Sequence, residues 1–335
     1  MKSIKPISSF FLFLSIVCSV IFTFSPNLAS AQSIFTPEQQ IELVDTFNTS
    51  LKQGTSALVG FSSISSISSG SFTFDGIDGL ADSHLDVYRV PVRYYAGEEG
   101  DSWRPFVELV VGHVRTDLEV APVDPEETER DKIKTKTTSF GFNLGTAWEY
   151  ADGFTLEPAV QANYTHFKRI TDYNTEFTQL VVALEPFLDR NFFNTSVDIF
   201  SVIPTLRQKV DFEVLGLNTG LDVKYNYIRN TSLNSKSQVA SFRSSASILQ
   251  SKLNLVIPSG VEAFTDEINL KPFFSRTDLF ADAKEGMGLS HYHEIGLGLD
   301  FTVPQLPEYL SKLELGAGYT FGEDFQGWRV GVSFL

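Results

Sequence analysis

The sequence predicts an all-β fold, a transmembrane antiparallel β-barrel of about twelve strands preceded by one short α-helix. Three observations support this fold: a secretory leader, long segments in which apolar and polar residues alternate, and aromatic residues near the ends of these segments. The chain of 335 residues contains 30 Phe and 11 Tyr but only 2 Met, a bias that favours strands over a helical bundle. Its formal net charge of -15 argues against nucleic acid as a partner.

Residues 1–31 are predicted to be a signal peptide. Two lysines form its charged start, FFLFLSIVCSVIF its apolar centre, and small residues ending at Ala31 its cleavage site, so we expect the mature chain to begin at Gln32. The one cysteine, Cys18, lies in this leader, which implies an exported protein without disulfides. Because no later run approaches the roughly 18 apolar residues of a spanning helix, a membrane-embedded chain would cross as a closed barrel.

A short helix is predicted after the leader, within residues 32–54. Thr36 is a suitable N-cap, a proline follows it at the first helical position, and apolar residues recur at helical spacing up to Gly54, a plausible stop. Residues 55–335 are then expected to form the barrel, and the helix is expected to lie in its lumen.

Beyond this helix, apolar and polar residues alternate in long runs. The clearest case is a hairpin over residues 140–164, whose two arms are joined by an Ala-Asp-Gly turn. A soluble β-sandwich also alternates, but its strands average about five or six residues, so the long runs and unequal turns favour a membrane barrel. The expected strands are 57–75, 84–96, 103–120, 134–150, 154–168, 200–215, 219–230, 237–257, 262–275, 290–303, 311–321 and a last strand from Trp328 to Leu335.

Two segments depart from this pattern. Residues 176–188 could form a strand, which with one more would give about fourteen strands, or a helix in an outer loop, which keeps about twelve. In the segment 103–120, the apolar face meets His113 and Arg115, so a β-bulge is expected there.

Residue parity places charged side chains of both signs in the lumen. They either form salt bridges that brace a barrel plugged by the helix, or line a narrow porin-like channel. A barrel of this size holds side chains and one helix, whereas open channels usually need about 16 strands, so we favour the plug. The expected lumen charges are Glu149, Glu157, Arg207, Lys209, Asp211, Glu213, Asp222, Lys224, Asp300, Lys312, Glu314 and Arg329.

Four lysines share the parity of the apolar, outward face near the outer end of a hairpin. They are Lys132, Lys134, Lys136 and Lys168. If the hairpin is regular, Phe140 lies opposite Tyr164 and Lys136 opposite Lys168. Cations at this level are positioned to meet the phosphates of lipopolysaccharide, although ordinary solvation of rim lysines explains them equally well.

The leader, the early helix, the glycine-rich strands and the segments LELGAGYTF and GWRVGVSFL resemble an autotransporter translocator domain. The resemblance covers about residues 55–335 and is closest to the solitary outer-membrane autotransporter barrel family. It implies a protein of the bacterial outer membrane, delivered by periplasmic chaperones and inserted by the barrel-assembly machinery. The insertion signal would be the terminal apolar face, formed by Trp328, Val330, Val332 and Phe334. The short segment between Gln32 and the first strand leaves no room for a passenger, so self-secretion is not expected.

No catalytic residue, metal site or cofactor is expected. His291 and His293 share the lipid-side parity, and His113 with Asp117 is the pair that could serve a hydrolase at the rim. The sequence contains no phosphate-binding glycine loop and no zinc or calcium spacing. We therefore expect a non-enzymatic structural or cell-surface interaction role, with a narrow channel as the alternative and an outer-membrane enzyme as the third hypothesis.

Overall fold

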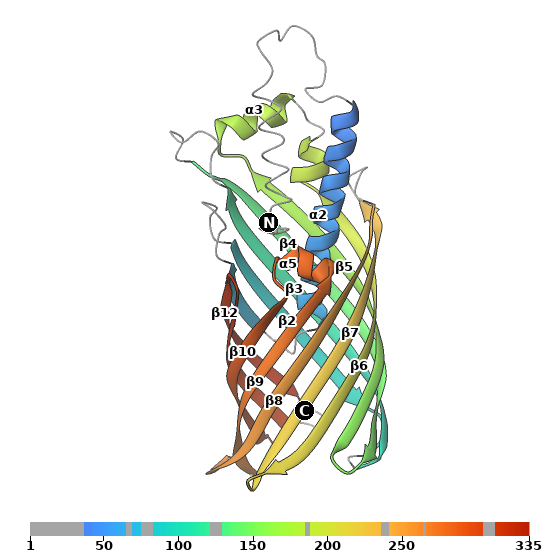
Figure 1. Ribbon diagram of the computed structural model, residues 1–335, viewed down its shortest axis with the longest axis vertical. Helices are drawn as coiled ribbons and strands as arrows, with labels where there is room; N and C mark the ends of the chain where they lie inside the picture. The colour runs from blue at the N-terminus through green and yellow to red at the C-terminus, as the bar shows by residue number, and fades with distance from the viewer. Residues whose placement is uncertain are drawn as a thin grey trace, which may run out of the picture.

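The protein is described by a computed structural model that covers residues 37–64, 69–74, 83–98, 100–120, 129–184, 188–235, 241–263, 266–303 and 312–334. Twelve antiparallel strands of these residues form a closed barrel in which each strand pairs with its sequence neighbours and β1 pairs with β12 (Figure 1). The predicted leader, with Ala31 and Gln32, lies outside the described residues. The strands are β1 (Ser69–Phe74), β2 (Ser83–Tyr95), β3 (Trp103–Val120), β4 (Asp131–Ala151), β5 (Phe154–Asp172), β6 (Ser196–Val214), β7 (Leu217–Ser235), β8 (Arg243–Ala263), β9 (Asp266–Ala281), β10 (His291–Thr302), β11 (Lys312–Gly322) and β12 (Phe325–Phe334).

The barrel has a continuous apolar face outside and many polar side chains inside, as the alternation predicts. In β4 and β5, Phe140 and Tyr164 are exposed and lie opposite each other, in the expected register. The positions of opposite parity in these two strands, such as Asn143 and Gln161, point inward and are buried. An exposed apolar face of this length is stable only against lipid, so the side-chain distribution itself indicates a membrane barrel.

The two ends of the barrel differ. We call one the turn end, because the strands there are joined by short connections such as Ala151 to Phe154 and Val214 to Leu217. At the second of these, Leu215 and Gly216 have φ values of 54° and 80°, as a two-residue hairpin turn with positive φ at both positions requires. The other end, the loop end, carries the helices α3 (Glu176–Leu184) and α5 (Asp282–Met287) (Figure 1).

The N-terminal helix is longer than the sequence predicts. Helix α2 (Pro37–Ile64) continues past Gly54, the expected stop, and the strand expected from residue 57 begins at Ser69. Beyond Gly54, the hydroxyls of Thr55 and Ser56 donate to helix carbonyls one turn earlier, at 2.7 and 2.8 Å. The barrel surrounds this half of α2, so the helix has no polar face toward solvent here. Without that face, the segment lacks the helical period, and the sequence therefore predicts a strand from residue 57.

The described residues of the segment 176–188 do not add strands to the barrel. Helix α3 and the π-helical turn η1 (Asp189–Phe193) lie in the connection from β5 to β6. The side chain of Asp131, at the start of β4, accepts hydrogen bonds from the Thr175 amide and hydroxyl at 3.0 and 2.9 Å. Thr175 in turn accepts a bond from the Thr178 amide at 3.3 Å, an N-cap contact that begins α3.

Tyr173 anchors the same loop. Its hydroxyl donates to Asp189 at 2.6 Å. Burial and this hydrogen bond raise the pKa of the Tyr173 phenol above its usual range, so the phenol stays protonated and remains a donor.

The bulge expected in the segment 103–120 is absent from the described strand β3. The pairing of β3 with β2 and β4 is continuous through His113 and Arg115, which stay on the outward face. Their polarity reflects their position toward the loop end, where the outward face leaves the apolar band. Register shifts occur instead in β4, β6 and β8, between Glu149 and Ala151, Asp198 and Ile199, and Pro258 and Glu262.

Helix α2 enters the barrel from the loop end (Figure 1). Its inner half packs on side chains from many strands, and Val59 belongs to one buried cluster with Val87 of β2, Ile203 of β6 and Ile248 of β8. Ser56 adds a polar contact, since its hydroxyl lies 2.8 Å from Ser244. Among the described helices, none is both long and apolar enough to cross a membrane.

Helix α5 folds over the part of α2 that enters the lumen. Lys52 of α2 forms an ion pair with Asp282 at 3.1 Å, and Gln53 donates to Glu285 at 2.6 Å. The two backbones approach closely at Gly286, where an added Cβ would overlap the Gln53 carbonyl group. Only glycine allows this contact.

We expect Gly286→Ala to destabilise the barrel by about 1–3 kcal/mol, because α5 must move away from α2. The measurement is urea unfolding in detergent, followed by the gel mobility of the folded band. Gly54→Ala is the matched control on α2. An added Cβ there meets nothing within 4 Å, so the helix should gain about 0.5–1 kcal/mol. Equal effects of the two substitutions would contradict the close contact.

Candidate functional site

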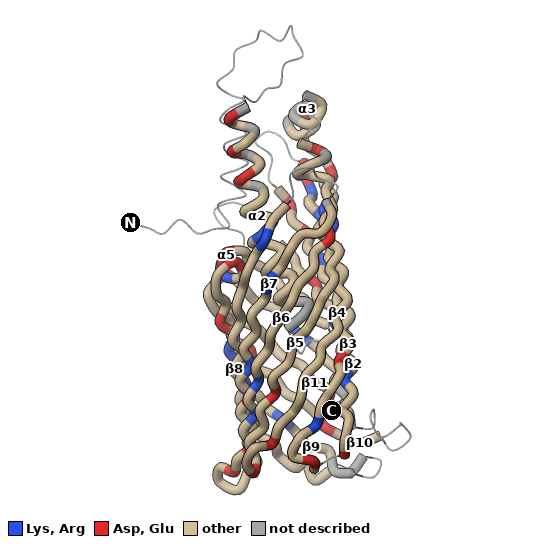
Figure 2. Tube along the Cα trace, turned by 90° about the vertical axis from the view of Figure 1, so that its right-hand side faces the viewer, with Lys and Arg blue, Asp and Glu red and all other residues tan. Residues whose placement is uncertain are grey.

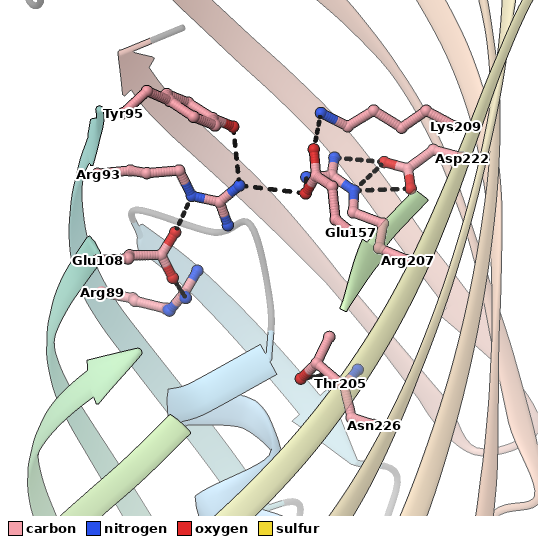
Figure 3. Close-up of polar contacts among 10 residues, drawn as sticks. All are labelled: Arg89, Arg93, Tyr95, Glu108, Glu157, Thr205, Arg207, Lys209, Asp222 and Asn226. Atoms are coloured by element: carbon pink, nitrogen blue, oxygen red, sulfur yellow. Dashed lines mark hydrogen bonds and ion pairs between the residues drawn. The ribbon is translucent and has the colours of Figure 1, made fainter. Parts of the chain in front are cut away.

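The largest group of connected charged side chains lies in the lumen. Period-two alternation directs these side chains inward from five strands, β2, β3, β5, β6 and β7, and Figure 3 shows their contacts. We call this set the inner charge network. Its members are Arg89, Arg93, Tyr95, Glu108, Glu157, Arg207, Lys209 and Asp222.

Glu157 of β5 is the centre of the inner charge network. One of its carboxylate oxygens lies 2.6 Å from the Lys209 Nζ, and the other lies 3.2 Å from Arg93 and 3.4 Å from Arg207. Its side chain is only 3% exposed. A carboxylate so buried is stable as an anion only with such cations around it. The contact with Arg93 links β2 to β5, strands that are not neighbours in the barrel.

Two arginines hold further carboxylates in the inner charge network. Arg207 donates to Asp222 from Nε at 2.8 Å and from Nη2 at 2.5 Å, a bidentate contact between adjacent strands. Arg93 donates from Nε to Glu108 at 2.7 Å and from Nη1 to the Tyr95 hydroxyl at 3.0 Å. These bonds join the faces of β2, β3, β5, β6 and β7, so the network braces the barrel wall.

A second charge network covers the wall from β8 to β12. Arg329 binds Glu294 at 2.7 Å, and Lys271 pairs with Asp300. Lys252 and Lys271 lie 3.9 and 3.8 Å from Glu314. The Lys252 ammonium is also 4.4 Å from the ring centroid of Phe273, a cation–π contact. This network contains equal numbers of the two charges.

The twelve lumen charges expected from the sequence do not form one group in the structure. The structure brings Glu157, Arg207, Lys209 and Asp222 together in the inner charge network, and Asp300, Glu314 and Arg329 in the second network. Lys224 lies beside Arg207 in the β6–β7 register. By contrast, Glu149, Asp211 and Glu213 are exposed near the turn end, because β4 and β6 extend there beyond the enclosed lumen. The Lys312 side chain lies outside the described residues.

Several network members were not predicted, although the same parity rule identifies them. Each is adjacent in the sequence to an apolar residue whose side chain points outward. Glu108, for example, lies between Val107 and Leu109. The residues missed in this way are Arg89, Arg93, Glu108, Lys252, Lys271 and Glu294.

The four outward lysines differ in their partners. Lys132 pairs with Glu119 at 3.1 Å and Lys134 with Asp172 at 2.6 Å. Lys136 and Lys168 lie directly opposite each other, as expected, and both are exposed. Within the described part of the chain, no carboxylate lies within 4 Å of either, so these two cations remain available to an external anion.

The histidine pair considered for hydrolysis is not assembled. His113 Nδ1 lies 3.1 Å from the Thr138 hydroxyl, whereas Asp117 pairs with Arg115 at 2.8 Å. His291 and His293 pack their rings on each other at 5.4 Å between centroids, and His293 stacks on Phe274. No group of three or more metal-ligating side chains occurs in the described part of the chain.

Ser71, His84 and Asp86 form a cluster on the outward face of β1 and β2 that the sequence did not indicate. Ser71 Oγ lies 3.0 Å from His84 Nε2, and Asp86 Oδ1 lies 3.1 Å from the same nitrogen. In a catalytic triad, the acid binds the other ring nitrogen, Nδ1, and so orients the base. The cluster therefore lacks the geometry that activates a serine.

The predicted insertion face lies on β12, which pairs with both β11 and β1 and so closes the barrel. Trp328, Val330 and Val332 point outward and are 68%, 63% and 44% exposed. The Phe334 side chain lies outside the described residues.

Residues 80–334 match the family model of the solitary outer membrane autotransporter beta-barrel domain. Two solved structures share the fold. The translocator domain of autotransporter NalP from Neisseria meningitidis is 11% identical, with a TM-score of 0.50 over 88% of this chain and 98% of that chain. The transport unit of autotransporter AIDA-I from Escherichia coli is 9% identical, with a TM-score of 0.53 over 86% of this chain and 99% of that chain. No curated protein matches the chain.

We expect Glu157→Gln to destabilise the barrel by about 3–5 kcal/mol, because three cations lose the buried carboxylate that they share. Thermal unfolding in detergent, read by gel mobility, measures the change. Glu149→Gln removes the same charge at an exposed position and should stay within about 0.5 kcal/mol of the parent. A Glu157→Gln barrel as stable as the Glu149→Gln barrel would contradict the bracing role.

Proposed function

The chain belongs to the solitary outer membrane autotransporter beta-barrel domain family, and we propose that it acts at the bacterial surface as a closed barrel plugged by its own helix. Its family and fold are those of bacterial outer-membrane proteins. The plug, and the structural or interaction role at the surface, are the parts that we propose.

The burial of α2 carries the proposal. Ser56 and Val59 are fully buried, and the side chains that cover them belong to the barrel wall. Around them, side chains of β2, β6, β7 and β8 form one continuous apolar cluster. A barrel with this number of strands has room for about one helix in addition to its own side chains. Helix α2 therefore has the size and the contacts of a plug.

The loop end has the features of an interaction surface. Outer-membrane barrels place short turns in the periplasm and longer loops outside, so we assign the loop end to the cell exterior. There, the outer half of α2 projects beyond the barrel and carries acidic residues (Figure 2). The side chains of Glu38, Glu42 and Asp45 are exposed. Ile41 is 70% exposed beside them, and Leu180 of α3 is 58% exposed. Apolar and acidic side chains thus stand together where a partner can reach them.

A narrow channel is the second candidate. Some inward side chains near the turn end keep part of their exposure, such as Lys271 at 22% and Lys209 at 33%, so water reaches them, whereas Glu157 is buried. Small solutes could cross this part of the lumen, but α2 stands between it and the loop end. Conduction would therefore require α2 to move.

Assembly and membrane contacts follow from the outward face. We propose that the barrel-assembly machinery and periplasmic chaperones recognise the apolar face of β12, whose Trp328 and Val330 are strongly exposed. Lys136 and Lys168 are proposed to bind phosphates of lipopolysaccharide at the outer rim. A non-enzymatic role stays a prediction.

Conductance in a planar bilayer tests the plug. We expect the full chain to give no porin-sized steps. The double substitution Ser56→Glu with Val59→Glu places two charges on the buried helix face, which should expel α2 and open the lumen. The control Ile41→Glu alters an exposed position of the same helix and should leave the barrel silent. Porin-sized steps from the unaltered chain would refute the plug.

Lipopolysaccharide retention during purification tests the lysine contacts. Reversing both Lys136 and Lys168 to Glu should lower the retained lipopolysaccharide several-fold, because two charge-assisted bonds are replaced by repulsion. Lys284→Glu, on an exposed lysine of α5, shows the effect of reversing a loop-end lysine outside this pair. Equal retention by all three proteins would contradict the contact and leave the two lysines as ordinary solvated cations of the rim.

A further inference from the structure

Among the described residues, the charges around Lys224 do not balance. The lumen faces of β2, β3, β5, β6 and β7 bring five cations together with three carboxylates in and beside the inner charge network. The cations are Arg89, Arg93, Arg207, Lys209 and Lys224, and the carboxylates are Glu108, Glu157 and Asp222. The group thus carries an excess of positive charge, in a chain whose formal net charge is -15.

Each of the three carboxylates is already bound by another cation. Asp222 accepts the bidentate contact from Arg207, and Glu108 accepts a hydrogen bond from Arg93. Glu157 is shared among three cations. No carboxylate oxygen of the described residues lies within 4 Å of the Lys224 ammonium, so this lysine has no anionic partner of its own.

The positively charged groups around Lys224 favour the binding of an anion beside it. In the barrel register Lys224 stands opposite Arg207 on β6 and Gln250 on β8. Arg89 and Arg93 also lie within electrostatic reach of Lys224, as do the carboxylates of Glu108 and Asp222. Like charges so close together repel each other, and a bound anion offsets that repulsion.

Water reaches the inward side chains around Lys224. Lys224 points inward yet is partly exposed, and the side chains of Arg207 and Lys209 are 26% and 33% exposed. Inward side chains that remain partly exposed are in contact with water inside the barrel. The packing differs around α2, where Ser56 and Val59 are fully buried. The lumen therefore has a dry half around α2 and a wet half around the cations.

We propose that this wet half of the lumen binds a small oxyanion, a phosphate group, at Lys224. A tetrahedral oxyanion accepts several charge-assisted hydrogen bonds, which suits an ammonium flanked by guanidinium groups. By the assignment of the turn end to the periplasm, the ligand enters from that side. Because Lys224 points into the lumen, the phosphate comes from a soluble molecule and not from a lipid headgroup. The site does not require α2 to act as a plug.

Binding of radiolabelled inorganic phosphate to the full chain in detergent tests the proposal. We expect saturable binding that Lys224→Met weakens roughly tenfold or more, as loss of a charge-assisted hydrogen bond implies. The control Lys271→Met removes a lysine of the second network that has its own carboxylate partners, and should retain phosphate binding. The folded, heat-modifiable gel band confirms that each barrel is intact.

Stability distinguishes the two lysines further. Without phosphate, Lys224→Met should not lower the unfolding temperature, because it removes an uncompensated cation, whereas Lys271→Met should lower it by leaving Asp300 unpaired. Phosphate should raise the unfolding temperature of the unaltered chain and not that of Lys224→Met. Absent phosphate binding, or equal binding by the unaltered chain and Lys224→Met, overturns the site.

Two further measurements distinguish the lumen site from a lipid-headgroup site and from the plug. Replacing zwitterionic by anionic phospholipid around the barrel should not displace the phosphate, and displacement would assign the site to lipid headgroups and contradict the lumen location. A chain that conducts but binds phosphate at Lys224 would contradict only the plug. A silent chain without phosphate binding would contradict only the oxyanion site.

Discussion

Lipid offers no hydrogen bonds to a polypeptide backbone, and a sheet that crosses it must therefore pair every edge. In this chain the requirement is met where β12 pairs with β1, after both have paired with their sequence neighbours. Once the sheet is closed, period-two alternation divides the side chains into a face toward lipid and a face toward the lumen. The apolar exterior, the charged interior and the place of α2 all follow from this closure.

Closure creates an electrostatic problem inside. Side chains that point inward cannot reach bulk water freely, so their charges need partners across the lumen. Contacts such as Arg93 to Glu157 join residues 64 positions apart and strands that do not neighbour each other. The same contacts that neutralise the charges thus tie distant parts of the wall together, which links the stability of the barrel to the chemistry of its lumen.

The lumen is divided by how each part is filled. Around the inner half of α2, apolar side chains and hydroxyls pack closely, and Ser56, Asn230 and Ser244 satisfy each other's hydrogen bonds. Nearer the turn end, long cationic and acidic side chains leave room for water. The two parts of the lumen thus differ in polarity and in packing, and the proposed plug and the proposed oxyanion site belong to different parts.

The sequence by itself determined the parts that depend on local period. Alternation identified β10 and β11 to within about two residues, and a tight turn set Phe140 opposite Tyr164. Parity also identified which charges point inward, including Glu157 and Arg207. Only the tertiary structure decided that α2 continues to Ile64, because a helix enclosed on all sides loses the amphipathic pattern that marks its end. The tertiary structure also decided which cation binds which carboxylate, and that Lys224 has no carboxylate within 4 Å among the described residues. Partners across a lumen depend on the closure and register of the whole barrel, and no local pattern of residues predicts them.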